Sequence, residues 1–295
     1  MDDVDSTLPL DCYGRIARLS LQRFNLMTRL PKITIITPSF NQGNFIDEAI
    51  RSILGQGYPY LEYIVMDGGS TDKTLEILRH YDRQLIWSSE KDRGQSHALN
   101  KGLALATGEV IGYINSDDYL EPGALFKVGD FFATHTEADW LTGKCRIVDE
   151  HDREIQRIVT YYKIFLLMFK SYKVILVMNP VSQPATFWRK KVSDDIGNFD
   201  ESIHFTMDYE YWLRIGSRYK LYTYNDYLAC FRMHSASKSF RSMKDMFDSQ
   251  QVVAHHYTSS KVLLGLQVLH NCLIRFLYKY FLSRNGNLFP EKQPR

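Results

Sequence analysis

The sequence predicts an α/β protein with a mostly parallel central sheet flanked by helices. From residue 32 to about 135, short β-branched runs alternate with longer stretches of helical periodicity. This alternation is typical of repeated strand–helix units around a parallel sheet. The chain has 295 residues, of which 44% are hydrophobic and 14% aromatic, so it can form one sizeable core.

Each element follows from its local pattern. Runs of β-branched and aromatic residues predict strands at 33–40, 63–67, 85–90 and 110–115. Apolar residues recurring every three or four positions predict the helices between them, at 44–56, 70–81 and 94–108. Further on, the stretch 187–201 is predicted as a strand, a turn and a short helix, and 208–216 as a helix packed on the core.

Polar and acidic side chains follow all four predicted strands. These clusters read "TPSFN", "DGGSTD", "SEKDRGQS" and "NSDD" in chain order. Open α/β sheets bind ligands beyond the carboxyl ends of their strands, which favours one shared site over four independent turns. The adjacent carboxylates of Asp117 and Asp118 would repel each other unless water, a donor group or a hard cation takes up their charge.

Composition and missing motifs exclude several classes. The formal net charge is +2, which gives no reason to expect nucleic acid as a partner. The loop after the first strand lacks the glycine pattern of a dinucleotide site, and no P-loop occurs in the chain. The four cysteines show no metal-ligand spacing and are predicted to be reduced, buried thiols.

The motifs "TPSFN", "MDGGSTDKT", "SEKDRGQSHALNKGLALATGEVIGYINSDD" and "MDYEYWLRIG" together resemble family 2 glycosyltransferases of the GT-A fold. The resemblance covers about residues 32–240. It implies a catalytic domain over that range, with a nucleotide-binding half at 32–135 and an acceptor half at 136–240. An N-terminal amphipathic segment at 1–31 and a helical C-terminal extension at 241–295 are predicted on either side.

The resemblance also implies a set of donor-binding residues. In that family the acid after the second strand contacts the nucleobase, and other positions of the strand-end loops bind the rest of the donor. The corresponding residues here are Asp67, Thr37, Pro38, Asp92, Asn115 and Asp118. Asp117 would be the ligand of a divalent cation, Mn²⁺ or Mg²⁺. Asn115 departs from the family's acidic pattern, although an amide can still bond a ribose hydroxyl.

The second half supplies the remaining candidates. The acid that opens the helix at 208–216 is the general base in the family, which here is Asp208; without the resemblance it reads equally well as a first-turn helix acid. Glu210 is the rival, but it should point about 200° away along a helix. Arg232, His234 and Lys238 resemble a family segment over the donor diphosphate, whose oxygens suit cations.

The implied activity is direct displacement with inversion. One sugar would move from a nucleotide-diphosphate sugar, with a UDP-sugar favoured, to a carbohydrate or lipid-linked acceptor in polysaccharide, lipopolysaccharide or glycolipid assembly of the cell envelope. Processive relatives carry a QxxRW motif, which this sequence lacks. The alternatives are a catalytically silent sugar-nucleotide-binding protein, which Asn115 and Met207 favour, and a nucleotidyltransferase, whose basic glycine-rich loop is missing.

The two ends of the chain carry basic amphipathic patterns. Residues 15–32 contain five cations and no acid, and 261–284 aligns leucines and aromatic residues beside Arg275, Lys279 and Arg284. These segments either pack on the domain or in a homodimer, or bind a membrane interface. The acidic start lacks a secretory signal, and no apolar stretch reaches the ~18 residues of a spanning helix. We expect a cytoplasmic protein, peripheral at the inner face of the membrane.

Overall fold

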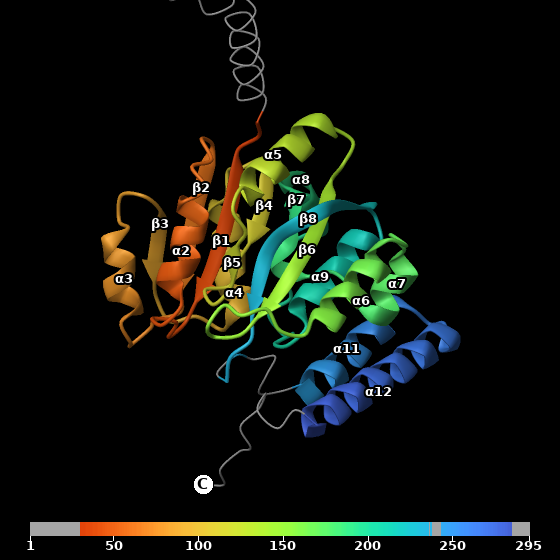
Figure 1. The fold of residues 1–295 in the computed structure, drawn as a ribbon. Coiled ribbons are helices and arrows are strands. Elements are labelled where there is room, and N and C mark those ends of the chain that lie inside the picture. The colour runs from red at the N-terminus through yellow and green to blue at the C-terminus, as the bar shows by residue number, and fades with distance from the viewer. Residues whose placement is uncertain (1–29, 236, 238–242, 285–295) are drawn as a thin grey trace, which may run out of the picture.

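The computed structural model describes residues 30–235, 237 and 243–284. Within these residues, eight strands form one sheet in the order β3-β2-β1-β4-β7-β6-β8-β5. Helices cover both faces of this sheet, and two long helices lie below its lower edge (Figure 1). The α/β class is therefore confirmed, whereas the predicted amphipathic segment at 1–31 falls almost entirely outside the described residues.

The first half of the sheet is parallel. β1 pairs with β2 and with β4, and β2 pairs with β3, all in parallel. The elements of this half are β1 (Ile33–Ser39), α2 (Ile46–Leu54), β2 (Leu61–Asp67), α3 (Thr74–His80), β3 (Ile86–Ser89), α4 (Gln95–Leu105) and β4 (Val110–Tyr113). Each strand begins and ends within two residues of its predicted bounds.

The second half makes the sheet mixed. β7 is antiparallel to β4 and β6, β5 is antiparallel to β8, and β6 and β8 are parallel. Its elements are β5 (Tyr119–Leu120), α5 (Ala124–Thr134), β6 (Trp140–Val148), α6 (Arg157–Leu167), α7 (Tyr172–Met178), η1 (Gln183–Ala185), β7 (Thr186–Arg189), α8 (Lys190–Ile196), α9 (Met207–Gly216) and β8 (Leu221–Arg232). After it come α11 (Met243–Tyr257) and α12 (Lys261–Arg284).

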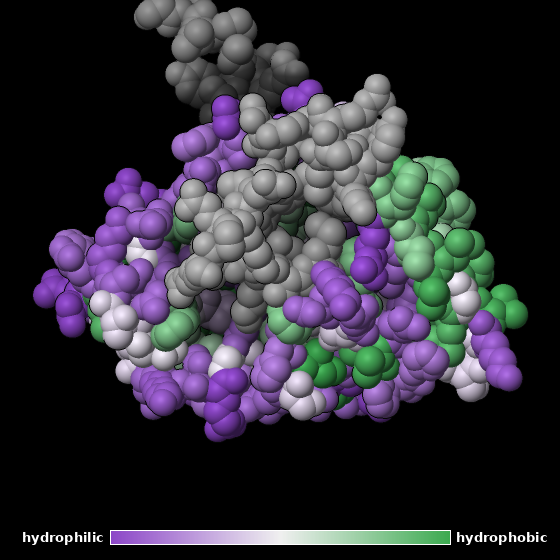
Figure 2. Space-filling model, turned by 90° about the horizontal axis from the view of Figure 1, so that it is seen from below, coloured by the Kyte–Doolittle hydropathy of each residue, from purple (hydrophilic) through white to green (hydrophobic). Residues whose placement is uncertain are grey.

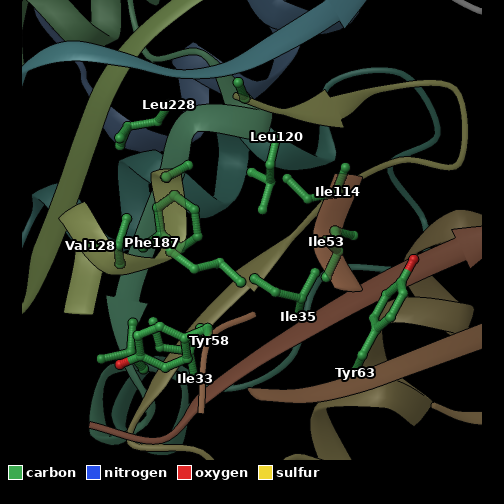
Figure 3. Packing of buried hydrophobic residues seen from close by; sticks show 14 of the residues in the cluster. Ile33, Ile35, Ile53, Tyr58, Tyr63, Ile114, Leu120, Val128, Phe187 and Leu228 are labelled. Carbon is green, nitrogen blue, oxygen red and sulfur yellow. The ribbon is translucent and has the colours of Figure 1, made fainter. Parts of the chain in front are cut away.

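The two faces of the sheet form two hydrophobic cores, because neighbouring strand residues point to opposite sides. Ile35 packs with residues of α2, α3 and α5, and Figure 3 shows part of this core around Ile35, Phe187 and Leu228. Ile36 packs on the other side with residues of α4, α7, α8 and α9. Each fully buried isoleucine contributes about 1.5–3 kcal/mol to folding.

Close packing fixes two helices that carry site residues. A Cβ at Gly102 would lie 2.5 Å from Cγ2 of Ile36, so only glycine lets α4 approach β1 this closely. On α9, Trp212 is fully buried and stacks on Trp140 with ring centroids 6.0 Å apart. The starts of α4 and α9 are thereby held at the lower edge of the sheet, where β1, β2 and β4 end (Figure 1).

The cysteine prediction is correct for two residues and wrong for one. Cys145 and Cys230 are buried free thiols on neighbouring strands, as expected. Cys272 is a free thiol as well, but it is exposed because it lies on the outer side of α12. Cys12 lies outside the described residues.

Candidate functional site

The loops that follow β1, β2 and β4 contact one another, as the shared-site prediction requires. The backbone N–H of Asn41 donates to Oγ of Ser70 at 2.7 Å, and Oδ1 of Asn41 accepts the N–H of Thr71 at 2.9 Å. The hydroxyl of Ser116 donates to the carbonyl of Pro38 at 3.2 Å. These bonds tie three strand ends into one floor at the lower edge of the sheet.

Asp67 organises this floor from inside. Its side chain is fully buried, and its carboxylate accepts the N–H groups of Gly69 and Ser70 at 3.1 and 2.8 Å. The hydroxyls of Ser70 and Ser89 add bonds of 2.5 and 2.6 Å. A carboxylate has about four acceptor positions, and these four donors occupy them. A nucleobase N–H would have to replace one of the two hydroxyls.

Asp92 is the more accessible acid beside Asp67. Its side chain is half-buried, and its Oδ1 accepts the N–H of Gly94 at 2.8 Å. A Cβ at Gly68 would lie 2.7 Å from Oδ2 of Asp92, so this glycine leaves the space that the carboxylate fills. The β2 and β3 loops therefore bring a second acid to the same edge of the sheet.

Thr37 and Pro38, the candidates from the first loop, are both buried. The hydroxyl of Thr37 lies 3.1 Å from that of Tyr63 on the neighbouring strand. The side chain of Thr37 is thus engaged inside the sheet. Pro38 contributes its carbonyl, which accepts the bond from Ser116 described above.

Asn115 is held as an amide, which explains its departure from an acidic pattern. Its Nδ2 donates to Oδ2 of Asp118 and to Oε1 of Gln183, both at 3.0 Å. Its Oδ1 accepts a bond of 2.6 Å from Nε2 of Gln95. An aspartate at this position would set a carboxylate against two acceptors, a repulsive arrangement.

The neighbouring acids Asp117 and Asp118 have different environments. Asp118 is buried, and it accepts the backbone N–H of Arg232 at 2.9 Å in addition to the Asn115 amide. Burial, followed by the charge of Asp117, raises the pKa of Asp118 well above its usual value. Asp118 thus lies beneath the floor, contrary to the expectation that it shares ligand binding, because its oxygens are engaged by protein donors.

Asp117 keeps a partly exposed carboxylate next to His234. Its Oδ2 lies 3.0 Å from Nε2 of His234, whose ring packs on Phe45 with centroids 4.4 Å apart. In the part of the chain that the structure describes, no group of three or more His, Cys, Asp or Glu side chains forms a metal site. The carboxylate of Asp117 nonetheless suits Mn²⁺ or Mg²⁺, which complete their coordination with phosphate oxygens and water.

Arg232 does not present its charge to a ligand. It is 2% exposed, and its Nη2 donates to Oε2 of Glu48 at 2.7 Å and to Oδ1 of Asp152 at 2.6 Å. Its guanidinium also lies over the ring of Tyr119. We expected Arg232 to bind the diphosphate. The structure instead gives it a structural role, because two carboxylates already balance its charge. Lys238 lies outside the described residues.

Asp208 reaches the same edge through α9. Oγ of Ser96 lies 2.9 Å from Sδ of Met207, so the start of α9 contacts the start of α4, where Gln95 bonds Asn115. Asp208 is half-buried, and burial raises the pKa of its carboxyl; backbone N–H groups of its own turn and the charge of Lys163 oppose that shift. A carboxyl with a raised pKa is a better proton acceptor at neutral pH.

Glu210, the rival candidate, is committed elsewhere. It is buried, and its oxygens accept Nε and Nη2 of Arg214 at 2.7 and 2.8 Å. The hydroxyl of Tyr257 on α11 donates to the same carboxylate. Glu210 therefore ties α9 to α11, and the two acids point in different directions as the helical geometry requires.

Lys163 on α6 was not found by sequence reasoning. Its half-buried ammonium donates to Oγ of Ser182 at 3.3 Å, just before η1. Burial lowers its pKa, while the neighbouring side chains of Cys145 and Asp208 oppose that shift. The signal in the sequence is a lone cation within the apolar run "YYKIFLLMF". Gln95 and Gln183 were missed as well, because an uncharged amide gives no chemical signal until its partners are known.

Comparisons with known proteins agree with this architecture. The family model described as Glycosyl transferase family 2 matches residues 34–197. An uncharacterised glycosyltransferase of Rickettsia typhi is 25% identical over 226 residues, covering 74% of this chain and 69% of that protein. The Bacillus subtilis protein TuaG, provisionally named for teichuronic acid biosynthesis, is 33% identical over 117 residues, covering 38% of this chain and 46% of TuaG.

Two solved structures share the fold. A mannosyltransferase from Pyrobaculum calidifontis superimposes with a TM-score of 0.64 at 16% identity, covering 94% of this chain and 85% of that one. Residues 1–349 of S. aureus TarS give a TM-score of 0.59 at 21% identity, covering 88% of this chain and 75% of that one. At these identities the likeness concerns the fold alone, and it confirms the GT-A architecture with a helical C-terminal extension.

Proposed function

Because the chain belongs to glycosyl transferase family 2, we propose that it is an inverting transferase that moves one sugar from a nucleotide-diphosphate sugar to an acceptor hydroxyl. The observation that carries this proposal is the arrangement around the lower edge of the sheet. Asp117 lies beside His234 at the end of β4, and Asp208 is held near them by the contacts between α4 and α9. One side would hold the diphosphate and the other would accept a proton.

The loops after β2 and β3 would bind the nucleoside. Asp67 keeps its loop in shape, and Asp92, with its half-buried carboxylate, would face the base or ribose. We propose a UDP-sugar as donor. Among the structures that share the fold, residues 1–349 of TarS were solved with UDP and with UDP-GlcNAc, and the Pyrobaculum enzyme with GDP-Man and Mn²⁺. Those ligands belong to those proteins, and they favour a nucleotide-diphosphate sugar here.

Asp117 and His234 would hold a divalent cation, Mn²⁺ or Mg²⁺. A bound cation of this kind would neutralise charge on the diphosphate as the sugar leaves. The protein's own contribution is to keep the two ligands together. His234 is buried against Phe45, and the bond from the backbone N–H of Arg232 to the carboxylate of Asp118 ties together the two loops that carry the ligands.

Asp208 would act as the general base. The acceptor hydroxyl gives its proton to the carboxylate of Asp208 while its oxygen bonds to the anomeric carbon. The bond from that carbon to the diphosphate oxygen breaks, and its electron pair leaves with the nucleotide diphosphate. Attack from the opposite face inverts the configuration. Lys163 stabilises the charged form of Asp208 before the proton arrives, since its ammonium interacts with that carboxylate.

For the biological setting, we propose assembly of a cell-envelope polysaccharide, lipopolysaccharide or glycolipid at the cytoplasmic face of the membrane. The name of TuaG supports an envelope role for that relative, of whose length this chain spans less than half. We also propose the division into a nucleotide-binding half at 32–135, an acceptor half at 136–240 and a C-terminal extension from 241. No helix in the described ranges is long and apolar enough to cross a membrane.

A nucleotide panel tests the donor proposal. Unfolding temperatures are measured with UDP, GDP, CDP and dTDP, each with and without Mn²⁺ or Mg²⁺, because a ligand that binds the native state stabilises it by mass action. We expect a metal-dependent increase with UDP. Release of UDP from UDP-sugars in the presence of candidate acceptors then tests transfer. Selective binding without transfer to any acceptor would favour the silent binding protein; binding of no nucleotide would refute both readings.

A further inference from the structure

Helix α12 turns its apolar side outward. Its exposed apolar residues recur at helical spacing along one stripe: Val262, Leu266, Leu269, Leu273 and Phe276. Leu269 is 65% exposed and Phe276 64%. The opposite side packs on the protein partly through polar groups, since buried Gln267 donates to the carbonyl of Leu176 and to the hydroxyl of Tyr209, both at 3.1 Å. Leu263, the first residue of the predicted stripe, packs on the second core, but the five exposed residues lie away from the packing face.

Helix α6 and the residues just after it also turn large apolar side chains outward. These exposed side chains are Ile158, Tyr161, Phe165, Met168 and Phe169. Ile158 is 73% exposed and Met168 72%. Phe165 and Phe169 contact each other edge to face, with centroids 5.3 Å apart, so part of the stripe is organised within itself.

Helices α6 and α12 contact each other beside their exposed stripes. Tyr162 of α6 and His270 of α12 stack with ring centroids 6.0 Å apart. Helix neighbours at three and four positions share a face, which puts Ile158 and Phe165 beside Tyr162, and Leu266 and Leu273 beside His270. Seen from below, Figure 2 shows hydrophobic surface gathered on one side, at the end of the molecule where α6, α7 and α12 lie in Figure 1.

Cations border this apolar surface. Lys170, Lys173, Lys261 and Arg275 are exposed on or beside α6, α7 and α12. The stretches 157–178 and 258–284 contain no aspartate or glutamate. The acids next to them in the sequence are Glu154, which pairs with Arg146 and Arg157, and those of α11. Contiguous exposed apolar surface rimmed by polar residues marks an interaction site.

We propose that the outer faces of α6 and α12 bind the surface of an anionic lipid bilayer. The apolar side chains would enter the acyl boundary while the surrounding cations approach the headgroups. A second copy of the chain fits less well, because a symmetric contact would set these cations against their own copies without an acid on either helix. The strands that carry the site end on the same lower side (Figure 1), so docking brings the acceptor half close to the lipid surface.

Flotation of the full chain tests this inference. The protein is mixed with phosphatidylcholine vesicles with or without phosphatidylglycerol, at low and high salt and without any donor. The test variant is Phe165→Glu with Leu269→Glu. Its matched control is Ile86→Glu with Leu105→Glu, two exposed apolar residues on β3 and α4. A third protein, Lys173→Gln with Lys261→Gln, measures the electrostatic part, for which each lost cation should weaken partitioning about fivefold.

We expect the native chain and its control to float with anionic vesicles at low salt, and the Phe165/Leu269 variant to stay in solution. Absence of flotation, or flotation that survives in that variant, would overturn the proposal. So would a concentration-dependent dimer that the variant dissociates without any vesicle binding, since a second copy would then occupy the surface. Because flotation is read without donor, failure of the proposed sugar transfer would leave this result unchanged.

Discussion

The two halves of the sheet edge hold their carboxylates differently. After β2 and β4, Asp67 and Asp118 are buried, and protein donors occupy their oxygens. At the start of α9, burial raises the pKa of Asp208, and backbone N–H groups of its own turn and the charge of Lys163 oppose that shift. Asp67 and Asp118 are thus engaged inside the protein, whereas Asp208 is the residue that we propose as the proton acceptor. The difference teaches that acids in similar loops serve either structure or chemistry, according to how many donors they meet.

The substitution with the largest expected effect is Asp208→Asn, which tests whether Asp208 differs in role from the buried acids Asp67 and Asp118. We expect transfer to fall by at least ~10²-fold, the usual scale of a positioned base, while donor affinity stays close to native. Calorimetry with UDP and a transfer assay separate the two effects. Asp226→Asn is the control, because Asp226 is an exposed acid paired with Lys127. Unchanged transfer in the Asp208 variant would remove Asp208 from the base role.

We expect Asp208→Asn to change the free energy of unfolding as well. The raised pKa of Asp208 determines the direction of that change. Because the folded pKa of Asp208 is raised, the folded state binds more protons than the unfolded state between the two pKa values. Ionisation therefore costs stability as the pH rises through that window. Asp208→Asn should unfold at a higher temperature than the native chain at neutral pH, with the difference shrinking at acidic pH. A lower unfolding temperature at neutral pH would contradict a buried, destabilising carboxylate.

The proposed metal ligands are tested by Asp117→Ala and His234→Ala. We expect each to reduce Mn²⁺-dependent affinity for UDP about 10- to 100-fold, the scale that loss of groups around a metal site produces. Metal-free affinity should change little. Asp194→Ala, at an exposed acid paired with Lys190, is the control. If titration calorimetry finds native Mn²⁺ dependence in both variants, the pair is a structural hydrogen bond.

Asn115→Asp tests the hydrogen bonds that hold the buried side chains after β4 in place. The new carboxylate would face oxygens of Asp118 and Gln183 that now accept bonds from the amide. Leaving such buried groups without donors costs about 1–3 kcal/mol, so denaturant unfolding should show a loss of that size. Restoring the family's acid should not raise metal affinity. A variant as stable as the native chain, with tighter Mn²⁺ binding, would show that Asn115 is a weakened ligand.

How much of the structure the sequence predicts depends on how far apart in the chain the interacting residues lie. Local periodicity predicts β1 to β4 within two residues, since each strand's pattern lies in its own residues. β6 and β8 were not predicted, although they are the longest strands of the described chain. β8 contains polar Asn225 and Asp226 at exposed positions, which weaken the alternation of a strand pattern.

The site shows the same limit. Acids at strand ends pointed correctly to one edge, but their roles depend on distant partners. Asp118 meets the backbone of Arg232, 114 positions away, and Arg232 meets Glu48, 184 positions away. No local pattern contains those pairs, so sequence reasoning took engaged groups for ligands. The roles of Asp67, Asp92, Asp117 and Asp208 remain predictions, and the variants above test those of Asp117 and Asp208.

The smallest expected effect concerns Lys163. We propose that this residue shifts the pKa of Asp208 without contacting a reacting atom. Its ammonium lowers the pKa of Asp208 from the value that burial alone would give. In Lys163→Met that pKa should rise, so more of the base is protonated at a given pH. The acidic limb of the pH profile of kcat should then move to higher pH, while KM for the donor stays close to native. Lys190→Met, at an exposed lysine, is the control. A lower kcat with an unmoved acidic limb would mean that Lys163 only packs against Ser182, because loss of packing alone does not change the proton affinity of Asp208.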